Sequence, residues 1–454
     1  MENEPLCPIE YRYGRSATRD LFSREAFLGR CLAVEAALAR SLAEEHLIPP
    51  AGARAIARAV SEGRVKLARV AALEEETRHD VMAIVKALSE VSGPGAPYVH
   101  MGATSNDVLD TARGLEMREA ADVLSASLES LIQALERQAL EHRGTLMVGR
   151  THGQQAVPTT FGYKLVNFLL EFDRHAERLR QLTPRLSVGK MSGAVGTGAG
   201  FGPKAARIES RTLGYLGLGV EEAPTQITGR DRLAEFVVWM ALVGSTLDRL
   251  ATEVRNLQRS EIGELMEPFD EAKQVGSSTM AQKRNPINSE NVSSLARLLR
   301  AFPQTALENM VSWHERDLAN SANERFLFSH GVILLDEMLG RMTRVVAGWH
   351  VNRDRMRENL ESSGGSVMSE HVMLELTRRG IPRQEAHELL RTLTRDLRPE
   401  EGDTLAVRAS RSPEVLRWVK RSEVPGLFDP RQYAKAAEQK ATRILNSRRR
   451  RPLP

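Results

Sequence analysis

Apolar residues repeat every three or four positions over long stretches of this 454-residue chain, and this repeat constrains the fold most strongly. No proline occurs between Pro224 and Pro268, and the apolar positions there keep one register, at Phe236, Met240, Val243, Leu247, Leu250, Val254 and Leu257. A helix over that segment could exceed ~45 Å at about 1.5 Å per residue. Heptad spacing over such a length indicates near-parallel helices packed in a bundle.

The same spacing recurs in two other segments. Their apolar positions are Phe27, Cys31, Val34, Leu38 and Leu42, then Met117, Ala121, Leu124, Leu128, Leu131 and Leu135. The first of these helices should end before Pro49 and Pro50. Because no run of alternating strands and no βαβ pattern occurs, we predict an all-α fold with minor hairpins at most.

The 236–257 helix is also apolar outside its main seam. Val237, Val238, Trp239 and Leu242 lie off the heptad positions. A helix that is apolar on more than one face is buried on more than one side. We therefore expect other subunits to complete the helix bundle.

Breaks rich in glycine, proline or serine divide the helical pattern. The breaks at 92–97 and 362–366 predict three helical domains, namely residues 1–97, a central long-helix bundle at 98–350, and a C-terminal domain at 351–454. Another glycine-rich stretch, residues 193–203, misses the Gly-x-Gly-x-x-Gly spacing because of Phe201 and Pro203. It also lacks the Gly-Lys-Ser/Thr ending of a phosphate-binding loop, and no strand precedes it.

The charge balance argues against a nucleic-acid-binding protein. The formal net charge is +4, and much of the excess lies in the run from Arg448 to Arg451. We interpret that run as a solvated, frayed tail rather than a contact for RNA or phosphate. No apolar stretch is long enough to span a bilayer and none follows the acidic N-terminus, so we expect a cytoplasmic protein without a membrane partner.

The cysteine and histidine patterns predict neither a disulfide framework nor a metal site. The two cysteines, Cys7 and Cys31, stand apart in the sequence. None of the eleven histidines forms a His-x-x-x-His or His-Glu-x-x-His pair. We expect no metal and no cofactor.

The most specific motif is residues 276–290, which read Gly-Ser-Ser-Thr-Met-Ala-Gln-Lys-Arg-Asn-Pro-Ile-Asn-Ser-Glu. The small, polar first half is typical of a mobile loop, and the basic second half suits closure over a negatively charged substrate. A glycine-serine linker before a helix that starts near Pro286 is the simplest alternative.

The motif resembles the signature loop of the fumarase/aspartase superfamily. It matches that loop from Gly276 to Pro286 except at Ala281, where the superfamily has proline, and Gln282 departs as well. Without proline the backbone loses a fixed angle. We therefore predict a more mobile signature loop, residues 275–290, than its relatives have.

Further clusters between Arg12 and Arg325 resemble one family of that superfamily, the adenylosuccinate lyases. Arginine suits phosphate and carboxylate groups, and a tyrosine ring can cover a base. The resemblance implies that the substrate-binding residues are Arg12, Tyr13, Arg78, His79, Asp80, Thr104, Ser105, Thr151, Gln154, Gln226, Asn285, Arg316, Ser321 and Arg325.

Several of these clusters also have a plain structural interpretation. Residues 77–80 and 315–325 could be charged helix faces, and Thr104 and Ser105 could cap a helix. Capping and substrate binding are compatible, since a helix N-terminus also attracts anions. His152 lies outside any apolar repeat, which argues against a core role, and a histidine side chain can transfer a proton near neutral pH.

The resemblance implies a β-elimination that releases fumarate from a nucleotide substrate. Ser277 would be the base, acting as an alkoxide stabilised by Lys283 and loop amides. Lys283 and Asn285 would stabilise the carboxylate on which negative charge develops. His152, held by Glu290, would protonate the departing nitrogen. The family also implies a homotetramer with active sites shared between subunits.

Two other interpretations stay open at this point. One is a different chemistry of the superfamily, such as a carboxymuconate cycloisomerase or a lyase for another N-succinyl compound. The other is a non-catalytic scaffold or an RNA-binding relative that uses the basic tail, for which steeply salt-dependent RNA binding would be the sign. The intact set of Ser277, Lys283, Asn285, His152 and Glu290 argues against lost catalysis.

Overall fold

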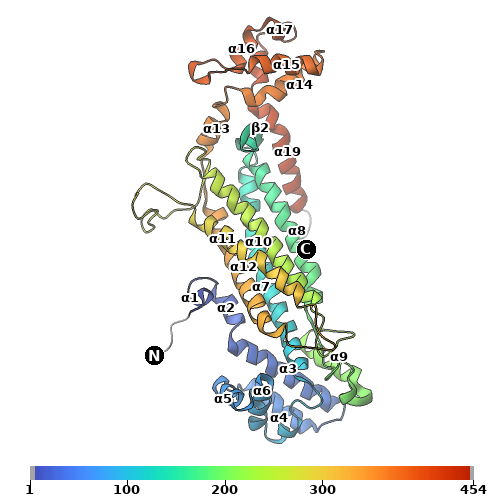
Figure 1. Cartoon of the computed structure of the whole chain (residues 1–454). Coiled ribbons are helices and arrows are strands. Elements are labelled where there is room, and N and C mark those ends of the chain that lie inside the picture. Colours follow the sequence, from blue (N-terminus) through green and yellow to red (C-terminus); the bar gives the residue numbers. More distant parts are fainter. Residues whose placement is uncertain (1–5, 450–454) are drawn as a thin grey trace. The chain divides into compact units, whose positions relative to one another are not determined.

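The computed structural model describes residues 6–449, and helices dominate this part of the chain (Figure 1). The predicted all-α class is confirmed. Strands in the described residues form three two-stranded sheets, of which β1–β2 and β5–β6 are antiparallel and β3–β4 is parallel. They are β1 (Leu146–Thr151), β2 (Gln154–Thr160), β3 (Val188–Gly189), β4 (Gly219–Val220), β5 (Leu265–Met266) and β6 (His350–Val351).

Five long helices carry the bundle pattern, and they are α7 (Ser105–Glu141), α8 (Phe161–Leu186), α10 (Asp231–Leu257), α11 (Ile287–Glu308) and α12 (Ser321–Gly348). The predicted 236–257 helix is α10, but its 27 residues correspond to about 40 Å, which is shorter than expected. It begins only at Asp231 because residues 221–230 form turns and irregular backbone. The longest helix is instead α7, with 37 residues.

The heptad positions of α10 are buried, as predicted, with Phe236, Val243 and Leu247 completely inaccessible. Two of the off-seam positions are buried within the chain itself. Trp239 is already buried by its own chain, and its Nε1 donates to the carbonyl oxygen of His175 at 3.0 Å. Val237 is buried too, so only part of the off-seam apolar surface is left for another subunit to cover.

The chain divides into two compact units. The first comprises Met1–Glu129, His175–Ser245 and Ser294–Gly340, and the second comprises Ser130–Arg174, Thr246–Ser293 and Arg341–Pro454. This division follows long-range contacts and does not test the three predicted domains, whose bounds stay a prediction.

Seven other helices and two 3₁₀ turns belong to the described part of the first unit. They are α1 (Pro8–Tyr11), α2 (Ser16–Leu21), α3 (Arg24–Glu44), α4 (Pro50–Ser61), α5 (Leu67–Thr77), α6 (Asp80–Val91) and α9 (Ala205–Leu216), with the 3₁₀ turns η1 (Gly93–Tyr98) and η2 (Ala199–Lys204). Ser23 caps α3, since its Oγ accepts from Ala26 N at 3.1 Å. The helix ends at Glu44, before Pro49 and Pro50, as predicted.

The second unit ends in a set of shorter helices with its own apolar cluster within residues 372–427. They are α13 (Arg353–Glu361), η3 (Ser366–Met368), α14 (Ser369–Arg378), α15 (Arg383–Leu393), η4 (Pro399–Glu401), α16 (Leu405–Arg411), α17 (Pro413–Leu416), α18 (Val424–Leu427) and α19 (Pro430–Arg449). In the described residues, no helix is long and apolar enough to cross a membrane.

The prediction of a frayed basic tail was wrong for Arg448. This residue lies in α19, and its guanidinium donates to both carboxylate oxygens of Asp173, at 2.8 and 2.7 Å, and to Glu136 at 2.7 Å. Two carboxylates on other helices therefore hold the end of α19 in place. Arg450 and Arg451 lie outside the described residues.

Candidate active site

The predicted site residues divide between the two units. The predicted catalytic side chains and their neighbours fall in the second unit, and they are Thr151, His152, Gln154, Ser277, Lys283, Asn285 and Glu290. The other residues predicted to bind the substrate fall in the first unit, and they are Arg12, Tyr13, Arg78, His79, Asp80, Thr104, Ser105, Gln226, Arg316, Ser321 and Arg325. The predicted base Ser277 and the predicted proton donor His152 thus belong to the same unit.

His152 lies at the tip of the β1–β2 hairpin. Thr151 pairs with Gln154, so His152 and Gly153 form a two-residue turn. Both turn residues have positive φ, +52° and +76°, which is what a type I′ turn requires. The His152 side chain is exposed. This placement agrees with the argument against a core role.

A buried ion pair fixes this hairpin within its unit. The Arg150 guanidinium donates to both carboxylate oxygens of Glu264, at 2.9 and 2.7 Å, and the Glu264 side chain is fully buried. Asn359 of α13 donates from Nδ2 to the same carboxylate at 2.9 Å. A bidentate arginine–carboxylate pair defines direction as well as distance. The hairpin is therefore anchored two residues from His152.

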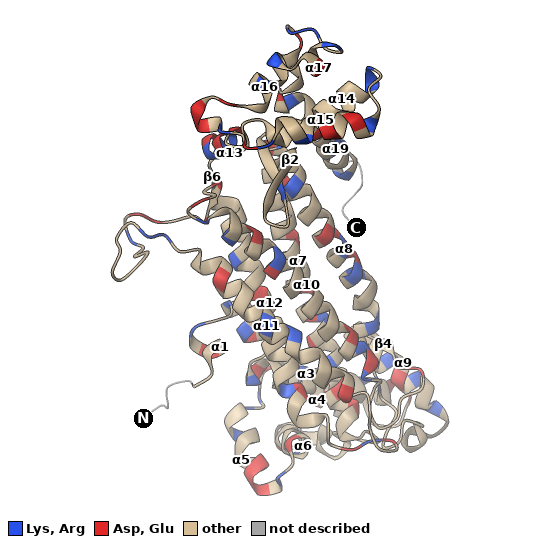
Figure 2. Cartoon of the chain, turned by 45° about the horizontal axis from the view of Figure 1, so that its top comes forward, with Lys and Arg blue, Asp and Glu red and all other residues tan. Residues whose placement is uncertain are grey.

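The signature motif lies in an irregular segment, as predicted. Residues 267–286 contain no helix or strand, and α11 begins at Ile287. Figure 2 shows both basic and acidic positions along this segment, which precedes α11. Asn285 donates from Nδ2 to the carbonyl oxygen of Gly276 at 3.1 Å. A Cβ atom at Gly276 would collide with the Lys283 carbonyl, so the two ends of the motif approach closely.

The Ser277 hydroxyl oxygen accepts hydrogen bonds from two loop amides. The donors are Thr279 N at 3.3 Å and Met280 N at 3.1 Å. Backbone N–H groups aimed at an oxygen favour negative charge on it. Ordinary serine turns have the same geometry, so these contacts alone do not identify a base.

Glu290 lies in the first turn of α11, and its side chain is exposed. Within the described residues of this single chain, no hydrogen bond or ion pair joins Glu290 to His152. The predicted role of Glu290 in holding His152 stays a prediction.

Ala281→Pro is expected to make the loop less mobile and to change turnover by no more than about fivefold, because proline removes at most ~1 kcal/mol of chain entropy. Ala281 lies in an exposed turn whose described contacts include the bond from Lys283 N to Met280 O. Hydrogen exchange of residues 275–290 and kcat measure the two effects. Unchanged exchange together with an unchanged rate would contradict a role for Ala281 in loop mobility.

Arg78, His79 and Asp80 form a junction between α5 and α6 rather than a helix face. Arg78 ends α5 in the left-handed conformation, with φ of +51°. His79 caps α6, since its Nδ1 accepts from Met82 N at 3.3 Å. Arg325 of α12 donates to Asp80 at 3.4 Å. The structure thus brings the 78–80 cluster to the predicted phosphate-binding Arg325.

Thr104 immediately precedes α7, and Ser105 is the first residue of that helix. Asp107 Oδ2 accepts from Thr104 N at 2.9 Å and from Gly193 N at 2.9 Å. Asp107 also forms an ion pair with Lys190, and both side chains are fully buried. Asp107 therefore joins the predicted Thr104–Ser105 site both to Lys190 and to Gly193, the first residue of the glycine-rich stretch 193–203.

His100, four residues before Thr104, is held by a buried carboxylate. Its Nδ1 lies 2.6 Å from Glu35 Oε1, and its backbone N donates to Glu35 Oε2 at 3.0 Å. Burial alone would lower the pKa of His100, but the hydrogen bond and charge of Glu35, with a further contribution from Asp107, raise it overall. The raised pKa favours a cationic imidazole beside the predicted nucleotide residues.

Gln226 and Arg316, which are both predicted to bind the substrate, contact each other. Arg316 Nη1 donates to Gln226 Oε1 at 2.9 Å, and Gln226 Nε2 donates to the Ala194 carbonyl at 2.9 Å. With its amide turned to satisfy both groups, Asn106 accepts from Arg316 at 3.0 and 2.6 Å.

The turn that carries Gln226 is anchored by Arg230. This guanidinium is paired with Asp110 of α7 and Glu324 of α12, at 2.8 and 2.9 Å. Burial raises the pKa of Asp110, but the charge and hydrogen bonds of Arg230 outweigh it and lower the pKa. Arg12, Tyr13 and Ser321 lie after α1 and at the start of α12, and their nucleotide contacts stay predictions.

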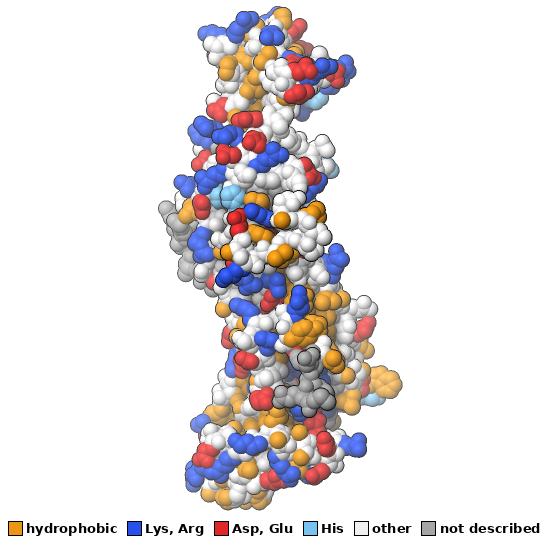
Figure 3. Space-filling model, turned by 90° about the vertical axis from the view of Figure 1, so that its left-hand side faces the viewer, with side chains coloured by type: hydrophobic (Ala, Val, Ile, Leu, Met, Phe, Trp, Pro, Cys, Tyr) orange, Lys and Arg blue, Asp and Glu red, His pale blue; other side chains and the backbone are white. Residues whose placement is uncertain are grey.

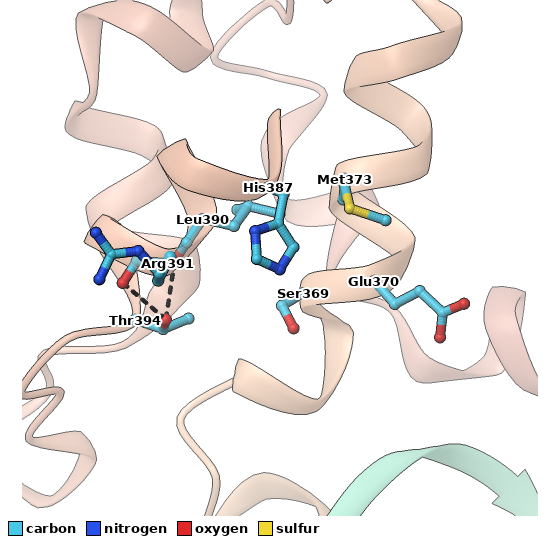
Figure 4. A pocket seen from close by; sticks show the side chains of 7 residues that line it. All are labelled: Ser369, Glu370, Met373, His387, Leu390, Arg391 and Thr394. Atoms are coloured by element: carbon cyan, nitrogen blue, oxygen red, sulfur yellow. Dashed lines mark hydrogen bonds between the residues drawn. The ribbon is translucent and has the colours of Figure 1, made fainter. Parts of the chain in front are cut away.

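A cavity of about 390 Å³ lies between α14 and α15, away from every predicted site residue in the sequence. Figure 4 shows the side chains that line it, with the charged ends of Glu370 and Arg391 pointing away from the His387 ring. In residues 6–449, no group of His, Cys, Asp or Glu side chains is arranged to hold a metal ion.

Comparisons with known proteins extend over almost the whole chain. The family model described as lyase matches residues 10–299, and the model described as adenylosuccinate lyase C-terminus matches residues 365–444. The chain is 46% identical to the adenylosuccinate lyase of Pyrococcus abyssi, over 97% of each chain. It is 46% identical to the adenylosuccinate lyase of Pyrococcus horikoshii, over 95% of each.

Among solved structures, the fold is similar to the 3-carboxy-cis,cis-muconate lactonizing enzyme of Pseudomonas putida. The TM-score is 0.88 at 32% identity, covering 98% of this chain and 99% of that one. The fold alone therefore does not separate the two chemistries, whereas the sequence relatives and the C-terminal model do.

Proposed function

The chain belongs to the adenylosuccinate lyase family, and we propose from that premise that it cleaves adenylosuccinate to AMP and fumarate. By the same family relation it would also cleave the succinyl-aminoimidazole-carboxamide ribotide of purine biosynthesis. The observation that carries the proposal is the 46% identity to a named adenylosuccinate lyase over 97% of both chains.

In the proposed reaction Ser277 removes a proton from the succinyl carbon next to a carboxylate. A serine hydroxyl is a weak base in water, so it must react as an alkoxide in a site that excludes water. The two amides that donate to Ser277 Oγ, from Thr279 and Met280, support this role because they favour charge on that oxygen. Lys283 and Asn285 are proposed to stabilise the substrate carboxylate as negative charge develops.

We assign the proton donor to His152. A histidine can give a proton to the departing nitrogen near neutral pH, and this one is exposed at the tip of an anchored hairpin. Glu290 is proposed to hold His152 in the assembled site, and Thr151 and Gln154 to contact the succinyl group. No step needs a metal or a cofactor.

The first unit would hold the nucleotide part of the substrate. Donors for the phosphate would come from Arg325, Arg316 and the 78–80 cluster. The N-terminus of α7, at Thr104 and Ser105, would favour an anion. Tyr13 and Arg12 are proposed to contact the nucleotide from the segment after α1.

We further propose a homotetramer with shared active sites. Large apolar side chains are exposed near the ends of α11 and α12, with Trp313 at 75% and Phe326 at 64% exposure, and Figure 3 shows apolar side chains gathered among charged ones on one face. Exposed apolar surface of this extent is typical of interfaces. Light scattering tests the assembly, and a monomer at working concentration would contradict it.

The other interpretations have less support. The cycloisomerase shares the fold, but the similarity to adenylosuccinate lyases is higher in identity and includes the C-terminal family model. An RNA-binding role of the basic tail is weakened because the guanidinium of Arg448 is already paired with Asp173 and Glu136.

The proposal is tested by mixing the purified protein with adenylosuccinate and following ultraviolet absorbance, while chromatography identifies AMP and fumarate. Turnover with stoichiometric release of both products is the expected result. An intact tetramer that converts neither adenylosuccinate nor the carboxamide ribotide would contradict the proposed substrate. Carboxymuconate tested in parallel would reveal the alternative chemistry.

A further inference from the structure

The two ends of the loop that carries Ser277 are tied together by one buried side chain. Glu267 is the first residue of the 267–286 loop and is 7% exposed. Its Oε1 accepts from Ser289 N at 2.6 Å, and its Oε2 accepts from Asn288 N and Asn288 Nδ2, both at 3.1 Å. Asn288 and Ser289 lie immediately after the loop, in the first turn of α11.

A second side chain bridges the same two ends. Gln258, which follows α10, accepts from Glu267 N through its Oε1 at 3.0 Å. Its Nε2 donates to the carbonyl oxygen of Arg284 at 3.0 Å. Gln258 therefore closes the base of the loop, while the residues between Glu267 and Arg284 form no helix or strand.

The Glu267 carboxylate suits this position physically. The first N–H groups of a helix have no partner within the helix, and the helix dipole places partial positive charge there. A carboxylate that accepts several such N–H groups is held by charge-assisted hydrogen bonds. The same helix turn carries Glu290, one residue after Ser289. The Glu267 carboxylate therefore fixes both the base of the loop that carries Ser277 and the helix turn that carries Glu290.

We propose that Glu267 is a positioning residue for the elimination. It does not touch the substrate, and it fixes the base of the 267–286 loop so that Ser277 returns to one place relative to Glu290. Misplacement of a reacting group by about 1 Å can cost about 10²-fold in rate. The inference rests on the proposed function of Ser277, but the hold of Glu267 on the loop can be measured without any substrate.

The test compares Glu267→Gln with Glu271→Gln in the full-length protein. Glutamine keeps the shape of Glu267 and removes its charge and part of its accepting capacity. Glu271 is a matched control, because it is a carboxylate of the same loop whose side chain is 73% exposed and paired with Arg284. Trypsin cleavage after Lys273, Lys283 and Arg284 reports loop opening, since all three are exposed.

For Glu267→Gln we expect cleavage in the loop at least about tenfold faster, faster hydrogen exchange confined to residues 267–290, and kcat lower by about 10- to 100-fold with KM changed less. Glu271→Gln should stay within about twofold of the wild type in each measurement, as exposed ion pairs contribute little. Glu267→Asp, which keeps the charge, should recover part of the loss. If Glu267 merely stabilised the helix, its substitution would speed hydrogen exchange throughout α11 and would not lower kcat more than it changes KM.

If Glu267→Gln shows the same loop cleavage and the same hydrogen exchange as the wild type, the inference is wrong, whatever the activity of the variant. If Ser277 proves dispensable for turnover, its proposed role as the base fails while the loop measurement still stands. Should Glu267→Gln not fold, Gln258→Met removes the second bridge and leaves the carboxylate in place. If Gln258→Met leaves the rate of loop cleavage unchanged, the claim that side-chain bridges hold the base of the loop closed is wrong.

Discussion

Ser277→Ala is expected to lower kcat for adenylosuccinate by at least about 10³-fold, because it removes the general base of the proposed elimination. The Ser277 hydroxyl accepts only local contacts in the described structure, from Thr279 and Met280 within its own loop. Its loss should therefore leave the fold and the assembly intact. Substrate binding should also persist, since the nucleotide is predicted to be held by residues of the first unit.

The measurement is kcat and KM by ultraviolet absorbance, with thermal unfolding and light scattering as checks on the variant. Ser278→Ala is the matched control, because it removes an identical hydroxyl from the next position, which is exposed. That control should retain kcat within about tenfold, as no general-base contribution is removed. A Ser277→Ala enzyme as active as the Ser278→Ala enzyme would place the base elsewhere.

The helices could be predicted from the sequence because burial follows a local period. The seam of α10 repeats at three and four residues, and those positions are buried in the structure. The length of α10 could not be predicted in the same way. Its start at Asp231 depends on Arg230, whose pairing with Asp110 and Glu324 holds the preceding turn out of the helix. Those partners are far away in the sequence.

The predicted site residues were found by motif, and their supports were missed. Glu264 and Glu267 flank β5 and look like ordinary surface carboxylates in the sequence. In the structure one fixes the hairpin of His152 through Arg150, and the other fixes the base of the Ser277 loop. Such pairings join residues that are distant in the chain, so no local pattern reveals them.

Six residues other than glycine have positive φ in the described part of the chain. Arg78, His100 and His152 have φ of +51°, +63° and +52°, in the left-handed region that side chains other than glycine seldom adopt. Such conformations cost free energy and persist where the surroundings enforce them, often at functional sites. Arg78 and His152 are predicted site residues, whereas His46, His314 and Asp396 adopt the same conformation outside the predicted set, so this conformation alone does not mark the site.

Asp107→Asn is expected to destabilise each subunit by about 3–5 kcal/mol, because it leaves a buried lysine without its counter-charge. Lys190 and Asp107 are both fully buried. The carboxylate also accepts from Ser192 N, Gly193 N and Thr104 N, at 3.0, 2.9 and 2.9 Å. An asparagine cannot accept on both sides, so at least one of these N–H groups loses its partner.

The same substitution should raise KM for adenylosuccinate, because Asp107 holds the N-terminus of α7 where Thr104 and Ser105 are predicted to bind an anion. Urea unfolding at fixed protein concentration measures the stability loss, and initial rates measure KM. Asp122→Asn is the matched control, since Asp122 is an exposed residue of the same helix and should change stability by less than about 0.5 kcal/mol. If Asp107→Asn unfolds at the same urea concentration as that control, the buried pair contributes little to the fold, and Thr104 must be held in place by contacts other than the carboxylate.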